Sequence, residues 1–169
     1  MPAPAHLTHL VRRFVGSLRP GGPGAAERRW VGAQLLPGEQ ALWDAMPGPD
    51  RRHAAAVARR VDAALDGLAP REVLAAALLH DVGKTTVGLR TPGRVVATVT
   101  AMVVGRDRAV GFDSAIGRYL RHDEGGADLL ERAGSASLTI AWTREHHLPR
   151  DRWTVPQPFA DALKAADDD

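Results

Sequence analysis

His80 and Asp81 stand side by side at the end of an apolar run that predicts a helix, and Gly83 and Lys84 follow directly. Imidazole and carboxylate groups bind hard and borderline divalent metals. At the end of a buried helix, such a pair directs two ligands into one place. The chain contains no cysteine, so any metal must be held by His, Asp and Glu. This composition favours Mn, Fe, Mg or a His/carboxylate Zn site over a structural zinc site.

Further candidate ligands share one property, which is a place on the apolar face of a predicted helix or at its end: His53, His122, His146, His147 and Asp167. Such residues on several helices predict ligands that converge in the core of a helical bundle. His53 lies four residues before Val57 on an apolar stripe, whereas Arg59 and Arg60 of the same helix are predicted to point away from that stripe.

Two of these assignments have alternatives. Asp167 lies four residues after Leu163 on the apolar stripe of the last helix, and Asp161 in the same helix is the competing candidate. His146 and His147 differ by about 100° around a helix, so both reach one site only where the helix ends. Pro149 favours such an end. If only one of the two binds, we favour His146, because it lies on the same side of the helix as Trp142.

Helices must position these residues, and the apolar spacing predicts an all-α fold. We expect a single bundle of six or more helices, without a convincing strand pattern. Residues 30–36 are ambiguous. Asp50 is the expected N-cap of the helix that carries His53, and Ser135 or Ser137 that of the helix before His146. The predicted helices cover residues 39–46, 50–66, 70–80, 91–104, 112–121, 123–134, 135–147 and 159–166.

The first 24 residues are expected to form an N-terminal arm and a Pro/Gly linker, followed by one helical domain over residues 25–169. The arm is predicted to dock on the domain as a short amphipathic helix, with surface anchoring or partner binding as the alternative. Arginines interrupt its apolar residues, which argues against a signal peptide. The valine-rich run at residues 95–104 is too short to cross a bilayer.

The length and the charge of the chain limit the classes of function that are possible. A chain of 169 residues with 44% hydrophobic and 25% charged residues is typical of one globular domain with a buried core. The net charge is +2 and no dense basic run occurs, so nucleic-acid binding is not expected. We therefore expect a cytoplasmic protein without a membrane span, whose oligomeric state the sequence leaves open.

The order of the candidate ligands resembles the HD-domain family of metal-dependent phosphohydrolases. The family pattern of His, His-Asp, His, paired His and a late Asp is met over about residues 38–169. The HDVGK form at residues 80–84 is among its more specific variants. Gly125 to Leu130 after His122, together with the histidine pair, resemble the branch that binds two metals. The Gly-Tyr-Pro signature of cyclic-di-nucleotide phosphodiesterases is absent.

This resemblance implies two divalent metal ions, Mn, Fe or Mg, that activate a water to cleave a phosphoester of a small phosphorylated or nucleotide substrate. It implies His53, His80, Asp81 and Asp167 as ligands of the first ion. For the second ion it implies Asp81, His122, His146 and His147. Asp81 is the candidate bridge because it has two oxygens and follows His80. A di-iron redox enzyme and a non-catalytic nucleotide sensor are the alternative functions.

Residues near the predicted metal site suit a phosphate. Lys84 is expected to hold a phosphate oxygen as a point charge, and the alternative is a surface ion pair. Arg144 is a candidate for bidentate substrate binding. Glu145 is expected either to orient a histidine or to lie on the helix surface. Thr85 and Thr86 fit a turn better than a phosphate contact.

Overall fold

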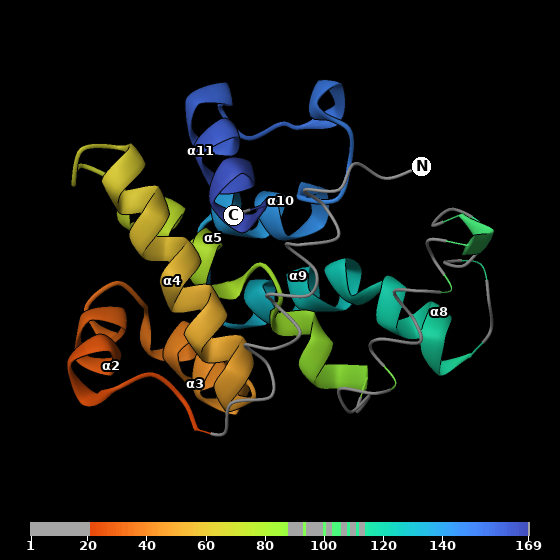
Figure 1. Cartoon of the computed structure of the whole chain (residues 1–169), viewed down its shortest axis with the longest axis horizontal. Helices are drawn as coiled ribbons and strands as arrows, with labels where there is room; N and C mark the ends of the chain where they lie inside the picture. The colour runs from red at the N-terminus through yellow and green to blue at the C-terminus, as the bar shows by residue number, and fades with distance from the viewer. Residues whose placement is uncertain are drawn as a thin grey trace.

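Helices and loops make up the part of the chain that the structure describes, and no strand occurs in it. The structure is a computed structural model that describes residues 21–87 and 114–168, with isolated positions between these ranges. Figure 1 shows the arrangement of the helices. The prediction of an all-α bundle is confirmed. The elements are α2 (Ala25–Gly32), α3 (Pro37–Ala45), α4 (Gly48–Ala64), α5 (Arg71–Leu79), the 3-10 helix η1 (Val82–Val87), α8 (Ala115–Leu120), α9 (His122–Arg132), α10 (Ser137–Glu145), the 3-10 helix η2 (Arg150–Arg152) and α11 (Gln157–Asp168).

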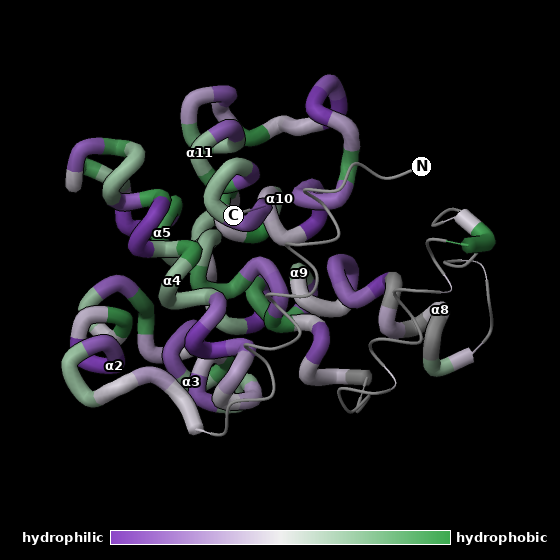
Figure 2. Tube along the Cα trace, viewed as in Figure 1, coloured by the Kyte–Doolittle hydropathy of each residue, from purple (hydrophilic) through white to green (hydrophobic). Residues whose placement is uncertain are grey.

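The central helix is α5. Every residue from Val73 to Leu79 is buried, which is typical of a helix surrounded by others. It packs against α3, α4, α10 and α11. The neighbouring helices carry one apolar face each, and Figure 2 shows this as short alternations of hydrophobic and hydrophilic segments along their traces. Because α5 ends in the core, the residues that follow it, His80 and Asp81, are also buried.

The predicted N-caps of two helices, α4 and α10, are wrong. Asp50 is not the N-cap of α4, which begins at Gly48 with Pro47 as its N-cap. Proline is well tolerated at the start of a helix, so the Pro47–Pro49 segment opens α4 rather than only closing α3. Asp50 lies in the first turn, where a carboxylate favours the helix dipole.

The predicted serine caps of α10 are also wrong. This helix begins at Ser137 after an N-cap at Ala136, and no side chain caps it. The ambiguous stretch at residues 30–36 holds the end of α2. The last helix, α11, is longer than predicted at both ends.

Some predictions fall on residues outside the described ranges. These are the N-terminal arm, the valine-rich helix at residues 91–104 except for isolated positions, and residues 112 and 113 at the start of the helix before His122. Across the described part of the chain, no helix combines the length and the apolar character that crossing a membrane requires.

Candidate metal centre

Three histidines are oriented by the same local contact. Nδ1 of His80 lies 3.0 Å from the carbonyl oxygen of Ala77. Nδ1 of His122 lies 2.8 Å from that of Tyr119, and Nδ1 of His146 lies 3.0 Å from that of Thr143. A carbonyl oxygen only accepts hydrogen bonds, so Nδ1 carries the proton and donates it. The Nε2 atom of each ring is therefore the one that remains for the interior of the cluster.

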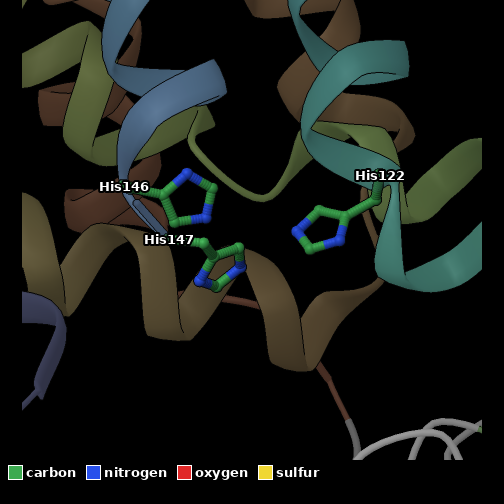
Figure 3. A group of neighbouring side chains, drawn as sticks. All are labelled: His122, His146 and His147. Carbon is green, nitrogen blue, oxygen red and sulfur yellow. The ribbon is translucent and has the colours of Figure 1, made fainter. Parts of the chain in front are cut away.

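The potential ligands form two groups in the folded chain. One consists of His53, His80 and Asp167, and the other of His122, His146 and His147; within each group one ligand atom per residue lies within 4.8 Å of the others. Figure 3 shows the second group, in which the histidines that follow α10 face His122 of α9. Both groups have the composition of a site that could hold a metal ion.

Asp81 lies between the two groups, with one oxygen toward each. Its Oδ1 is 3.3 Å from Nε2 of His122 and 4.0 Å from Nε2 of His146. Its Oδ2 is 3.5 Å from Nε2 of His80 and accepts a hydrogen bond from Nζ of Lys84. Each oxygen of the Asp81 carboxylate therefore faces a different group of potential ligands.

The structure distinguishes the two late aspartates. Oδ1 of Asp167 is 3.1 Å from Nε2 of His53 and 3.5 Å from Nε2 of His80. Asp161 instead accepts two hydrogen bonds from the exposed Arg150 guanidinium, at 2.9 and 2.6 Å. Asp167, which shares the buried stripe of α11, is the aspartate that joins the cluster.

The paired histidines both reach the cluster because α10 ends at Glu145, immediately before them. His146 is the C-cap residue of this helix, and both histidines lie in the group with His122. His146 is buried and His147 is exposed. Their ring centroids lie 3.9 Å apart.

Charges within the cluster hold its members in different protonation states. Burial by itself would raise the pKa of Asp81, but Lys84, His80 and His122 outweigh it and keep this pKa well below its usual range. Burial, followed by repulsion from His80, lowers the pKa of His146 to about 3. Asp81 is therefore ionised and His146 neutral at neutral pH, which are the forms that bind metal.

His80 behaves differently from His146. Burial would lower its pKa, but the carboxylates of Asp81 and Asp167 more than compensate and raise it above its ordinary value. A bound proton and a bound metal ion thus compete at His80, because both are attracted by the same two carboxylates.

The donor atoms fit a divalent ion. Among the described residues, no hydrogen-bond partner meets Nε2 of His80 or of His146, although both atoms are buried. A buried polar atom without a partner costs free energy, and a cation placed between these nitrogens and the Asp81 carboxylate would remove that cost. Nitrogen and carboxylate donors without sulfur suit Mn, Fe, Mg or Zn.

Gly83 has a role that the sequence did not reveal. A Cβ atom at this position would overlap the carbonyl oxygen of His122 and lie 2.7 Å from the backbone nitrogen of Gly126. The absence of a side chain lets η1 and α9 approach at backbone distance. This approach brings Asp81, just before η1, within reach of His122, the first residue of α9.

Lys84 and the threonines after it have clear partners. The ammonium group of Lys84 pairs with Asp81, so its ion pair lies in the cluster and not on the surface. Thr85 and Thr86 donate to the carbonyl oxygens of Val82 and Gly83, at 2.7 and 2.8 Å. This agrees with the turn role predicted for both threonines.

Arg144 is not brought to the cluster. Its exposed guanidinium donates to Glu131 at 2.7 Å and lies 3.9 Å from Asp128, both on α9. Its predicted substrate contact finds no support in this placement, because the guanidinium of Arg144, the next-to-last residue of α10, pairs with nearby carboxylates of α9.

Glu145 takes neither of its two expected roles. It is buried, and its oxygens accept hydrogen bonds from the backbone nitrogen and the hydroxyl of Thr154, each at 2.6 Å. It therefore ties the end of α10 to the loop before α11.

Arg60 does not point away from the apolar stripe as predicted, since it donates to the carbonyl oxygen of Ala166 in α11. Its spacing of seven residues from His53, two helical turns, was the available signal.

Comparison with known proteins agrees with this geometry. The family model described as the HD domain matches residues 52–168, more than half of the chain, and this range includes every candidate ligand. No curated protein and no solved structure matched the chain. With its His-Asp pair, its two groups of potential ligands and this match, the chain belongs to the HD-domain family, a superfamily that in general comprises metal-dependent phosphohydrolases.

Proposed function

We propose that this protein is a metal-dependent phosphohydrolase that cleaves a phosphoester of a small phosphorylated or nucleotide substrate. The observation that carries the proposal is the placement of Asp81, whose Oδ1 faces His122 and His146 and whose Oδ2 faces His80 and Lys84. Membership of the HD-domain family supports the reaction class.

The proposed ligands divide between the two groups, with Asp81 shared. His53, His80 and Asp167 complete one site, and His122, His146 and His147 complete the other. Divalent ions bound there, Mn, Fe or Mg, would neutralise the charge of the phosphate and acidify a water. The protein contributes an ionised bridging carboxylate and imidazoles whose Nδ1 protons are engaged by carbonyl groups, so that Nε2 is available as a ligand.

Lys84 is the proposed phosphate-binding residue. Its side chain is 15% exposed and that of Asp81 8%, so Lys84 is the more accessible partner of this ion pair. A phosphate that approaches Asp81 from solvent meets this cation. An ammonium group on a flexible stem can turn from the carboxylate to a phosphate oxygen, which places it among the groups that stabilise charge during hydrolysis.

Metal analysis combined with a phosphate-release screen tests the proposal. Wild type, Asp81→Asn and Asp161→Asn would be compared for bound Mn, Fe, Mg and Zn, and for release of phosphate from nucleotides and small phosphoesters. Asp161 is a matched control because its carboxylate pairs with Arg150 outside the cluster. We expect wild type and Asp161→Asn to bind metal and release phosphate, and Asp81→Asn to lose both properties.

Other results would reject the proposal. Full metal content and activity in Asp81→Asn would remove the bridging role. Iron-dependent oxygen uptake without phosphate release would indicate a redox enzyme, and nucleotide binding without any product would indicate a sensor.

A further inference from the structure

We propose that Arg60 is a positioning residue that holds the last turn of α11 so that Asp167 faces His53 and His80. This inference rests on the proposed function, in which Asp167 is a metal ligand. Nε and Nη2 of Arg60 both donate to the carbonyl oxygen of Ala166, at 2.9 and 2.7 Å. A cation that binds a carbonyl at a helix C-terminus is favoured both as a hydrogen-bond donor and by the helix dipole.

The contact from Arg60 reaches the last described turn of α11. Ala166 lies in this turn, and the two hydrogen bonds on its carbonyl oxygen tie the turn to α4. Without the donor from Arg60, the carbonyl group of Ala166 would bind water instead, and this turn would be held less firmly against α4. Asp167 would then lose its fixed place in the cluster.

The contacted carbonyl is directly linked to the ligand residue. The carbonyl group of Ala166 and the backbone nitrogen of Asp167 belong to one planar peptide group. Fixing this oxygen therefore fixes the plane from which the Cα atom of Asp167 projects its carboxylate. That carboxylate lies 3.1 Å from His53 and 3.5 Å from His80, distances that leave little tolerance for rotation of the turn.

One face of α4 supplies both contacts to α11. His53 and Arg60 are seven residues apart, about two turns, so their side chains project on the same side of the helix. His53 contacts the Asp167 side chain, and Arg60 holds the peptide group that precedes it. α11 packs against α4, and the two helices are neighbours in Figure 1.

The next residue of α4 offers a matched control. Arg59 is also an arginine, but its Nε donates to Glu27 at 2.9 Å and its guanidinium lies 3.6 Å from the centre of the Trp30 ring. It contacts α2 and not α11. Replacing Arg59 removes the same charge from the same helix without touching the contact to Ala166.

Direct metal titration and hydrogen exchange test the inference without using activity. Mn²⁺ binding and amide exchange of the peptide at residues 157–168 would be measured for wild type, Arg60→Gln, Arg60→Lys and Arg59→Gln. We expect Arg60→Gln to weaken one of the two Mn²⁺ sites by roughly 10- to 100-fold, the range for residues that orient ligands, and to leave the other unchanged. Exchange at the end of α11 should rise in the same variant, also in metal-free protein.

The two remaining single variants sharpen the result. Arg59→Gln should match wild type in both measurements. Arg60→Lys should recover part of the Mn²⁺ affinity, because an ammonium group can donate to the carbonyl of Ala166 but cannot offer two nitrogens in a fixed fork.

A double-mutant cycle separates positioning from a general structural effect. If Arg60 acts through Asp167, then Arg60→Gln should not weaken Mn²⁺ binding further in an Asp167→Ala background. Equal weakening in both backgrounds, or unchanged affinity and exchange in Arg60→Gln, would overturn the inference while the proposed function stands. Absence of Mn²⁺ and other divalent ions from wild type would instead reject the proposed function, and with it the ligand role of Asp167.

Discussion

Gly83→Ala is the substitution for which the structure makes the sharpest prediction. The added Cβ atom would overlap the carbonyl oxygen of His122 and lie 2.7 Å from the backbone nitrogen of Gly126. Both obstacles are backbone atoms of α9, so no side chain can rotate away. The two segments must separate, and the carboxylate of Asp81, now 3.3 Å from Nε2 of His122, would move with η1.

The expected magnitude follows from overpacking. Inserting a methyl group into a filled space costs roughly 1 to 3 kcal/mol and occasionally more. Since backbone meets backbone here, we expect a loss of about 3 kcal/mol in the free energy of unfolding. For a chain of this size, 1 kcal/mol corresponds to roughly 2 to 4 °C in melting temperature, which gives a decrease of about 6 to 12 °C.

Gly125→Ala is the matched control in the same contact region. A Cβ atom at this position would lie 3.7 Å from the Thr86 hydroxyl, an ordinary contact distance. Alanine is favoured over glycine in a helix by about 1 kcal/mol, so this variant should be as stable as wild type or more stable.

Urea unfolding, thermal melting and metal content would be measured for Gly83→Ala, Gly125→Ala and wild type. We expect Gly83→Ala to lose stability and to bind less metal at the group that contains His122. The reasoning is refuted if Gly83→Ala melts with wild type and retains full metal content, or if both alanine variants lose equal stability.

Four shorter predictions concern single contacts. Lys84→Met should retain its metal ions but lose phosphate release, because the substitution removes the phosphate-binding cation and leaves the ligands. Glu145→Ala should lower the free energy of unfolding by about 1 to 3 kcal/mol, since two donors of Thr154 lose their acceptor, as urea unfolding would show. Arg144→Gln should leave phosphate release unchanged because its partner is Glu131. In metal-free protein, stability should fall by about 2 kcal/mol between about pH 7 and pH 5 relative to His146→Gln, because the unfolded chain binds a proton that native His146 rejects.

Each of these predictions has a result that would contradict it. Loss of metal from Lys84→Met would assign the lysine to the integrity of the centre, and normal stability of Glu145→Ala would mean that water replaces the carboxylate. Reduced activity of Arg144→Gln would restore the original substrate role. For His146 the sign is definite: its pKa is about 3 in the native state against 6.5 ordinarily, so stability must decrease as the pH falls below about 6.5, and identical pH profiles would refute the shift.

Much of the fold and of the ligand order could be read from the sequence. Apolar spacing identified a bundle of helices with the His80-Asp81 pair at the end of a buried one, because periodicity reports directly which face of a helix is buried. The same spacing placed Asp167 on an inward face of α11, and Pro149 indicated a helix end near His146. These are local properties, determined within a few residues of chain.

Only the tertiary structure shows which partners the charged side chains have. It paired Arg144 with Glu131, Asp161 with Arg150, and Glu145 with Thr154, so none of these charges serves the cluster. A long charged side chain is compatible with many local conformations, and only the neighbouring helix selects its partner.

The backbone approach of Gly83 to α9 and the grip of Arg60 on α11 have the same origin. A glycine in the sequence can indicate a close approach but does not identify the segment that approaches. An arginine on a helix indicates a charge but does not identify the carbonyl group to which it donates. His80 and Asp81 were evident from their types and spacing. Their assembly with His53, His122 and Asp167 was decided by packing, because contacts between residues distant in sequence exist only once the helices have come together.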